Sequence, residues 1–246
     1  MHRYQILIEY VGTDFVGWQI QSNGKSVQKL IQIKISKLIK EKVNLIGAGR
    51  TDAGVHAIEQ SAHFNCKKKI KDLDKFLKSI NFFLNNKLVS IIKIKKKKLN
   101  FHSRFSAKER VYRYIIFNRS SKPSIAKDRG WHIRKKLDIV LMKRGAKKLL
   151  GTNDFSTFRA SSCRAKSAIK KMKLIRIKKT KDRIEIQFKS QSFLQQQVRS
   201  MVGCLKYLAE KKWTLKKFEK VFKSKKRIYC APPAPAHGLF LEKVIY

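Results

Sequence analysis

The sequence VQKLIQIKISKLI occupies residues 27–39 and decides the fold of the first half of the chain. Its apolar residues recur at intervals of three and four, which predicts an amphipathic helix with one face on a core. Strand-like runs and a second helical segment surround it, at 4–11, 43–48, 59–66, 73–80 and 88–95. The order β-α-β-β-α-β is that of the split βαβ, or ferredoxin-like, arrangement.

The second half of the chain repeats this order. It contains a strand at 110–118, a helix at 137–150 that ends at Gly151, a hairpin of strands 168–179 and 183–189, an apolar helical stripe from Leu194 to Leu208, a short helix near 214–223 and a last strand at 238–246. We therefore predict an α+β protein of two ferredoxin-like βαββαβ domains, residues 1–102 and 107–246, with mainly antiparallel sheets. We expect a catalytic cleft between the two domains.

The charge of the chain is extreme. Its 246 residues include 59 lysines and arginines against 16 aspartates and glutamates, a formal net charge of +43. A nucleic acid is the first explanation, and a membrane surface is less favoured because the basic runs are not amphipathic helices with aromatic faces. Lysine-rich runs at 66–72, 93–98 and 224–227 also fit drift in an A+T-rich genome, and we interpret them as solvated surface. The charge indicates the partner without locating its site.

Cysteine and histidine spacing indicates no metal site. The cysteines form no CxxC pair and the histidines no HExxH motif, a usage that fits the reducing cytosol. No run approaches the roughly 18 apolar residues of a membrane span, and the N-terminus lacks the pattern of a secretory signal. We expect a cytoplasmic protein that needs no metal and contacts no membrane.

The run GAGRTDAGVHA at residues 47–57 holds a single carboxylate, Asp52, in a segment with few lysines. Gly49 and Gly54 let the backbone turn tightly there and a ligand approach closely. Asp52 is either a turn residue paired locally with Arg50 or a nucleophile or base that acts on a polyanion. A lone carboxylate without metal ligands fits neither the usual glycosidases nor a two-metal nuclease.

Two further segments combine groups that suit RNA chemistry. In FHSRFSAKERVYRY, at 101–114, Tyr112 and Tyr114 share one face of a strand and are either sheet core or a platform for an unstacked base. In FLQQQVRSMVG, at 193–203, Arg199 lies off the apolar stripe of its helix, and Gly203 clears space beside it. Arg199 is either an ordinary surface arginine or a partner that lowers the pKa of a carboxylate by about 1–3 units.

Together these motifs resemble the tRNA pseudouridine synthase A (TruA) family across nearly the whole chain. The order of the motifs is that of the family: YVGTDFVGWQ at 10–19, GAGRTDAGVHA at 47–57, FHSRFSA with RVYRY at 101–114, GTNDFSTFR at 151–159, VRSMVG at 198–203 and APPAPAHGL at 231–239. The resemblance implies a homodimer that isomerises uridine to pseudouridine at positions 38, 39 and 40 of the tRNA anticodon stem-loop. It implies no metal and no organic cofactor.

Residue by residue, the resemblance makes Asp52 the catalytic aspartate, Tyr112 the tyrosine that stacks on the target uracil, and Arg199 the arginine paired with the aspartate. Arg50 and Arg159 match motif arginines that bind RNA. Gln197 departs from the pattern, because the family usually has a methionine at its position. The packing of that helix against the active site is therefore left open.

Two alternatives remain at this point. One is an enzyme of the same family that acts on other tRNA positions. The other is a non-catalytic basic RNA-binding protein, such as a tRNA chaperone, which explains the charge but gives Asp52 no task because a carboxylate repels phosphate.

Overall fold

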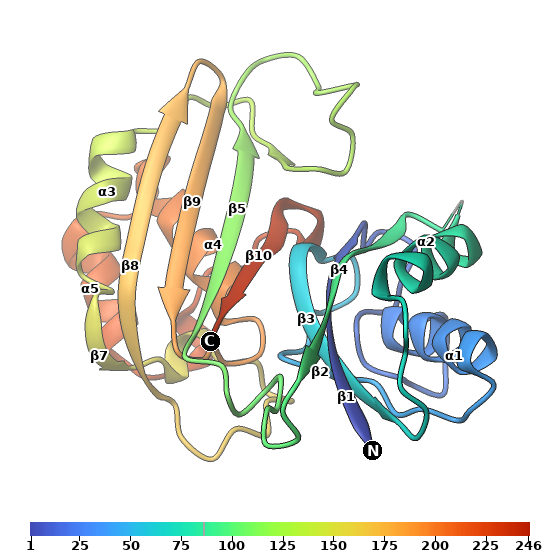
Figure 1. Ribbon diagram of the computed structural model, residues 1–246. Coiled ribbons are helices and arrows are strands. Elements are labelled where there is room, and N and C mark those ends of the chain that lie inside the picture. The colour runs from blue at the N-terminus through green and yellow to red at the C-terminus, as the bar shows by residue number, and fades with distance from the viewer. Residues whose placement is uncertain (86) are drawn as a thin grey trace. The chain divides into compact units, whose positions relative to one another are not determined.

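The computed structural model describes residues 1–85 and 87–246 and divides into two compact units. The first unit comprises Met1–Lys108 and Phe240–Tyr246, and the second comprises Glu109–Leu239. Each combines helices with a mostly antiparallel sheet (Figure 1), which confirms the predicted α+β class. The domain boundaries 1–102 and 107–246 stay a prediction, and the structure groups the C-terminal strand with the first unit.

The first unit follows the predicted β-α-β-β-α-β order. Its elements are β1 (His2–Tyr10), α1 (Val27–Ile39), β2 (Ile46–Gly47), β3 (His56–Cys66), α2 (Leu73–Leu84) and β4 (Val89–Lys97). Strand β1 lies between β3 and β4 and is antiparallel to both, while β2 is antiparallel to β3. The C-terminal strand β10 (Leu239–Ile245) runs parallel to β3, with Phe240 opposite His56.

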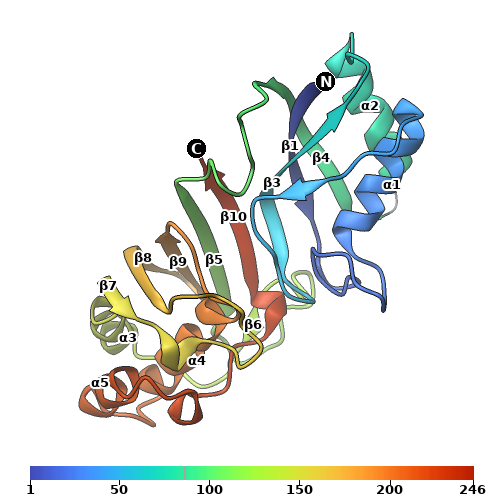
Figure 2. The same cartoon turned by 90° about the horizontal axis from the view of Figure 1, so that it is seen from below.

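Local sequence explains the two helices of this unit. Ser26 and Asp72 cap their N-termini, because each side chain accepts the backbone N–H three residues further on. Both helices cover the same face of the sheet (Figure 2), where Ile31 and Ile80 are fully buried with Phe64 of β3. The apolar stripe predicted for α1 is therefore the face that closes this core.

The second unit contains β5 (Glu109–Phe117), β6 (Trp131–His132), α3 (Ile139–Lys147), β7 (Gly151–Asp154), β8 (Ile169–Thr180), β9 (Arg183–Ser190), α4 (Gln197–Ala209) and α5 (Leu215–Lys223). Its antiparallel sheet has the order β5-β9-β8-β7, and β6 runs parallel to β5. The predicted hairpin of β8 and β9 is confirmed. Helices α3, α4 and α5 lie on one side of the sheet (Figure 1), with Leu205 and Phe218 in their core.

One boundary in this unit was predicted wrongly. The helix expected at 137–150 ends at Lys147, and the following residues tighten into turns, with the Leu149 N–H donated to the Ala146 carbonyl. Gly151 does not terminate the helix but begins β7, opposite Met172 of β8. The four residues of β7 show no alternation that would have predicted a strand.

In the part of the chain that the structure describes, no helix has both the length and the apolar character needed to cross a bilayer.

Candidate active site

Asp52 lies in the turn between β2 and β3, and the segment 10–19 packs against this turn. The Trp18 N–H donates to the Thr51 carbonyl at 3.1 Å, and the Tyr10 hydroxyl lies 2.8 Å from the Thr51 hydroxyl. Tyr10, Trp18 and Thr51 are all buried, whereas Asp52 is half-buried. Two motifs far apart in the sequence therefore form one rigid support beneath the candidate catalytic carboxylate.

Two glycines with positive φ make this packing possible. Gly17 has a φ of +110°, and a Cβ there would lie 2.6 Å from the Thr51 carbonyl oxygen. Gly54 has a φ of +75°, which lets the Val55 N–H return to the Asp52 carbonyl at 3.2 Å. The chain thus closes a tight turn around Asp52, as the glycine spacing predicted for Gly54.

Strand β3 anchors the entry to the same turn. The Gln60 side-chain amide donates to the Gly49 carbonyl at 2.9 Å, and the Ala48 N–H donates to the Ser61 carbonyl at 2.7 Å. Arg50 projects from this anchored segment as an exposed residue, and its Nε donates to the Gln19 side chain at 3.3 Å. Its guanidinium charge is available to an anionic ligand at the surface.

The two tyrosines of β5 have different surroundings. Tyr114 is fully buried and its hydroxyl donates to the Pro235 carbonyl at 2.9 Å. Burial raises the pKa of Tyr114, against the opposing charge of Arg199. Tyr112 keeps 8% of its surface exposed, and its ring packs edge-on against Phe193 with 5.1 Å between centroids. Tyr114 is therefore sheet core, and Tyr112 is the tyrosine with an accessible part.

Arg199 is held in place by the segment that follows α5. Its Nε donates to the Ala234 carbonyl at 2.7 Å, and the Ala234 N–H donates to the Arg199 carbonyl at 2.9 Å. One turn along α4, a Cβ on Gly203 would lie 2.1 Å from the Pro232 carbonyl oxygen. Gly203 thus clears space, as predicted, and the space is filled by the backbone that orients Arg199.

The motif APPAPAHGL, residues 231–239, consequently connects α4 to β5. Two consecutive carbonyls accept these bonds: that of Ala234 from Arg199 of α4, and that of Pro235 from Tyr114 of β5. The sequence marked this motif only through the family resemblance, because a proline-rich loop has no periodicity that reports its contacts.

Gln197 is compatible with this arrangement. Its side chain is fully buried, and its Oε1 accepts the Leu194 N–H at 2.8 Å, which closes the turn into α4. The preceding residue, Gln196, adopts a φ of +60° and makes no side-chain cap. The Gln197 Nε2 has no hydrogen-bond partner within the described part of the chain, and leaving such a donor unsatisfied costs about 1–3 kcal/mol. A polar residue therefore occupies this core position at some cost in stability.

Arg159 follows the short 3₁₀ segment Ser156–Phe158 and is half-buried. Its Nη2 donates to the carbonyls of Cys163 at 2.5 Å and Ala165 at 2.9 Å. These contacts order the basic loop that contains Arg164 and Lys166. Whether Arg159 binds RNA directly stays a prediction.

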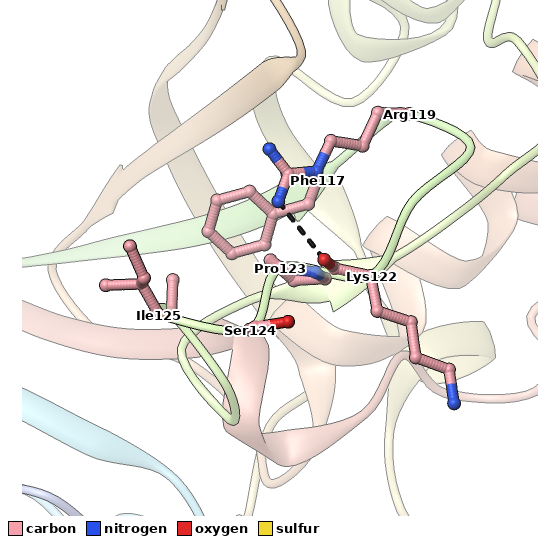
Figure 3. Close-up of a pocket in the computed structure, with 7 residues that line it drawn as sticks. Phe117, Arg119, Lys122, Pro123, Ser124 and Ile125 are labelled. Atoms are coloured by element: carbon pink, nitrogen blue, oxygen red, sulfur yellow. Dashed lines mark hydrogen bonds between the residues drawn. The ribbon is translucent and has the colours of Figure 1, made fainter.

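The loop between β5 and β6 encloses a hollow of about 340 Å³, lined by Phe117, Arg119, Lys122, Pro123, Ser124, Ile125 and Ala126 (Figure 3). Arg119 donates to the Lys122 carbonyl at 3.2 Å and to the Asp182 carboxylate at 2.8 Å. Since this guanidinium already holds the loop to the β8–β9 turn, the hollow is not a built anion site, and no predicted site residue lines it.

The predicted site residues thus fall into two groups. Asp52 and Arg50 belong to the first unit, and Tyr112, Arg159 and Arg199 belong to the second. Residues that position them were missed, namely Tyr10, Gly17, Thr51 and Ala234. Among residues 1–85 and 87–246, no three His, Cys, Asp or Glu side chains gather in a way that could hold a metal ion.

Comparison with known proteins identifies the class of protein. Residues 6–106 and 146–246 match the sequence model of the tRNA pseudouridine synthase family. The chain belongs to this family, which confirms the resemblance seen in the motifs.

Individual relatives are similar over the whole chain. tRNA pseudouridine synthase A of Pelagibacter ubique (strain HTCC1062) is 76% identical over 246 residues, which cover 100% of both chains. The proteins of the same name from Parvibaculum lavamentivorans and Paramagnetospirillum magneticum are 40% and 41% identical over all of this chain and cover 100% and 96% of their own lengths.

Proposed function

We propose that this protein isomerises uridine to pseudouridine at positions 38, 39 and 40 of the tRNA anticodon stem-loop. Membership of the tRNA pseudouridine synthase family supports an isomerase that acts on tRNA. The observation that carries the proposal furthest is the Asp52 turn, in which a half-buried carboxylate sits on a backbone fixed from both sides by segment 10–19 and β3.

The reaction breaks the N1–C1′ bond of uridine, turns the uracil, and joins its C5 to C1′. The C5 hydrogen leaves to solvent as a proton and N1 gains one, so atoms and electrons balance without an oxidant or reductant. The target base must first leave the helical stack, which costs a few kcal/mol. A rigid protein site that receives the base offsets this cost.

Within this proposal, Asp52 is the nucleophile or base, and Arg199 is the counter-charge that keeps it ionised. Tyr112 stacks on the target uracil, since aromatic stacking contributes about 1–3 kcal/mol per base. The reciprocal bonds between Arg199 and Ala234 support this role, because a guanidinium fixed in advance needs no reordering when the substrate binds.

Arg50 and Arg159 are proposed to bind the RNA backbone. The exposure of Arg50 supports a phosphate contact, and the loop ordered by Arg159 presents Arg164 and Lys166 near it in the chain. With a net charge of +43, the protein attracts a polyanion. The proposal includes a homodimer that works in the cytoplasm.

The test combines two assays on purified protein. Transfer RNA that contains uridine tritiated at C5 releases tritium to water only if the C5–H bond is broken. Mapping of pseudouridine in the product tRNA then assigns the position. Tritium release with pseudouridine at 38–40 supports the proposal, release with pseudouridine elsewhere contradicts the position, and tRNA binding without release contradicts the enzyme.

A further inference from the structure

The loop that precedes β5 presents the aromatic side chain of Phe105 to solvent. Phe105 leaves 75% of its surface exposed. It lies in a turn closed by the Ser106 N–H to the His102 carbonyl at 2.8 Å, and by the His102 N–H to the Ser106 hydroxyl at 2.9 Å. Phe105 is therefore held out to solvent by a hydrogen-bonded turn.

A buried polar network fixes this turn from below. The Ser103 hydroxyl lies 2.6 Å from His63 Nδ1, which also accepts the Ser103 N–H at 3.1 Å. The Tyr246 hydroxyl donates to the Ser103 carbonyl at 2.9 Å. Ser103 and His63 are almost completely buried, so these bonds are protected from water.

Two side chains lie over the ring of Phe105, which still leaves most of its surface exposed. The His102 ring lies 4.4 Å from it between centroids, and the Arg104 guanidinium carbon lies 5.4 Å from its centroid. His102 Nδ1 accepts the N–H groups of both Arg104 and Phe105, at 3.1 and 3.3 Å. The result is a largely exposed cluster of two aromatic rings and a guanidinium, the groups on which unpaired nucleobases stack.

We propose that Phe105, with His102 and Arg104, forms a stacking site for one unpaired base of the tRNA substrate. The inference rests on the proposed tRNA substrate and adds a contact that is separate from the uracil stacked on Tyr112. An RNA occupant is favoured over a protein because an arginine lies over the ring and the whole chain is strongly basic.

The chain offers a matched control. Phe82 of α2 is equally exposed, at 76%, in the same unit. It lies on a helix face against Phe83, with 6.0 Å between centroids. Loss of the Phe82 ring removes the same apolar area without removing a built platform.

The experiment measures the Kd for unmodified tRNA by fluorescence anisotropy at one salt concentration. We expect Phe105→Ala to weaken binding about 5- to 150-fold. This range corresponds to about 1–3 kcal/mol, the binding free energy contributed by one stacked base. Phe105→Trp should bind within about threefold of the wild type, and Phe82→Ala within about twofold. The salt dependence of Phe105→Ala should equal that of the wild type, because no ionic contact is lost.

A set of tRNAs that each lack one base identifies the occupant. Removal of the stacked base should weaken wild-type binding by the same factor and leave the binding of Phe105→Ala unchanged. The inference is overturned if Phe105→Ala binds tRNA like Phe82→Ala, or if it alters the sedimentation of the protein alone while tRNA binding is kept. Tritium release by the wild type is measured in parallel, so failure of the proposed function is recognised separately.

Discussion

Arg199 and Ala234 exchange two hydrogen bonds, the Arg199 Nε to the Ala234 carbonyl at 2.7 Å and the Ala234 N–H to the Arg199 carbonyl at 2.9 Å. The guanidinium is therefore oriented by main-chain atoms. A change in a neighbouring side chain disturbs such atoms little. The remaining N–H groups of the guanidinium keep a defined direction, so Arg199 offers a fixed donor geometry as well as a positive charge.

Arg199→Lys tests this geometry. Lysine keeps the positive charge but lacks the planar fork and the Nε donor. Loss of one hydrogen bond of a charged group, about 1.5–3 kcal/mol, should lower kcat/KM for pseudouridine formation about 10- to 150-fold. Arg144→Lys, at an exposed position of α3, should stay within about twofold. Equal activity of the two variants would show that charge alone suffices at position 199.

Gly17→Ala should damage the Asp52 turn without touching the carboxylate. The new Cβ would meet the Thr51 carbonyl at 2.6 Å, at a φ of +110° that strains any other residue by about 1–3 kcal/mol. We expect at least about a tenfold loss of pseudouridine formation, with the Kd for tRNA within about threefold. Gly151→Ala is the control, because its φ of +88° imposes similar strain while its Cβ would meet only Asn153 Nδ2, at 4.0 Å. If both variants keep full activity, segment 10–19 does not position the turn.

His63 should make stability depend on pH. Burial, helped by the charges of Arg3 and His102, lowers the pKa of His63 from its usual 6.5 to about 4. Between these values the unfolded chain binds a proton that the native chain does not, so the free energy of unfolding falls as the pH falls from 6.5 to 4. The contribution of His63 at the acid end is about 3 kcal/mol.

Urea unfolding at pH 7, 5.5 and 4.5 measures this dependence. His63→Gln should show a shallower fall in the free energy of unfolding than the wild type over this range, whatever its stability at pH 7. Parallel curves for the two proteins would contradict the assignment of the proton to His63.

Cys230 should be the most reactive thiol. Its Sγ lies 3.5 Å from the Cys204 Sγ and accepts from Arg227 Nη1 at 3.5 Å, and these two contacts lower its pKa despite partial burial. The pKa of Cys204 is raised, first by its hydrogen bond with Cys230 and then by burial. Cys230 is half-buried, whereas Cys66, Cys163 and Cys204 are buried.

A disulfide reagent in excess should therefore show one fast phase, followed by slow phases. Cys230→Ser should abolish the fast phase, and Cys163→Ser should retain it. A fast phase that survives Cys230→Ser would place the reactive thiol elsewhere.

Local patterns predicted much of the fold. Helix α1 has the predicted bounds because its apolar stripe and the Ser26 cap are both encoded within a few residues. The hairpin of β8 and β9 was visible for the same reason. The pairing of Phe240 with His56 was not visible in the sequence. Parallel pairing of residues 184 positions apart (240 − 56) leaves no local signal.

The site was predicted less completely than the fold. Asp52 and Gly54 stand out in a glycine-flanked turn, but the clamp by Tyr10, Gly17 and Trp18 depends on contacts from another part of the chain. Sequence likewise marked Arg199 by its place off the apolar stripe, while its partner Ala234 is a small residue in a proline-rich loop. A backbone carbonyl that orients a charged side chain can belong to any residue type, so the sequence does not identify it.

The central claim is that Asp52 performs the chemistry, and the most direct measurement is tritium release by Asp52→Asn from tRNA tritiated at uridine C5. The substitution is nearly isosteric, removes the negative charge and replaces one acceptor oxygen with an NH2 donor. We predict release at the level of a protein-free control, with the Kd for tRNA within about threefold of the wild type, while Asp74→Asn, at an exposed position of α2, remains fully active. Wild-type release by Asp52→Asn would contradict the account.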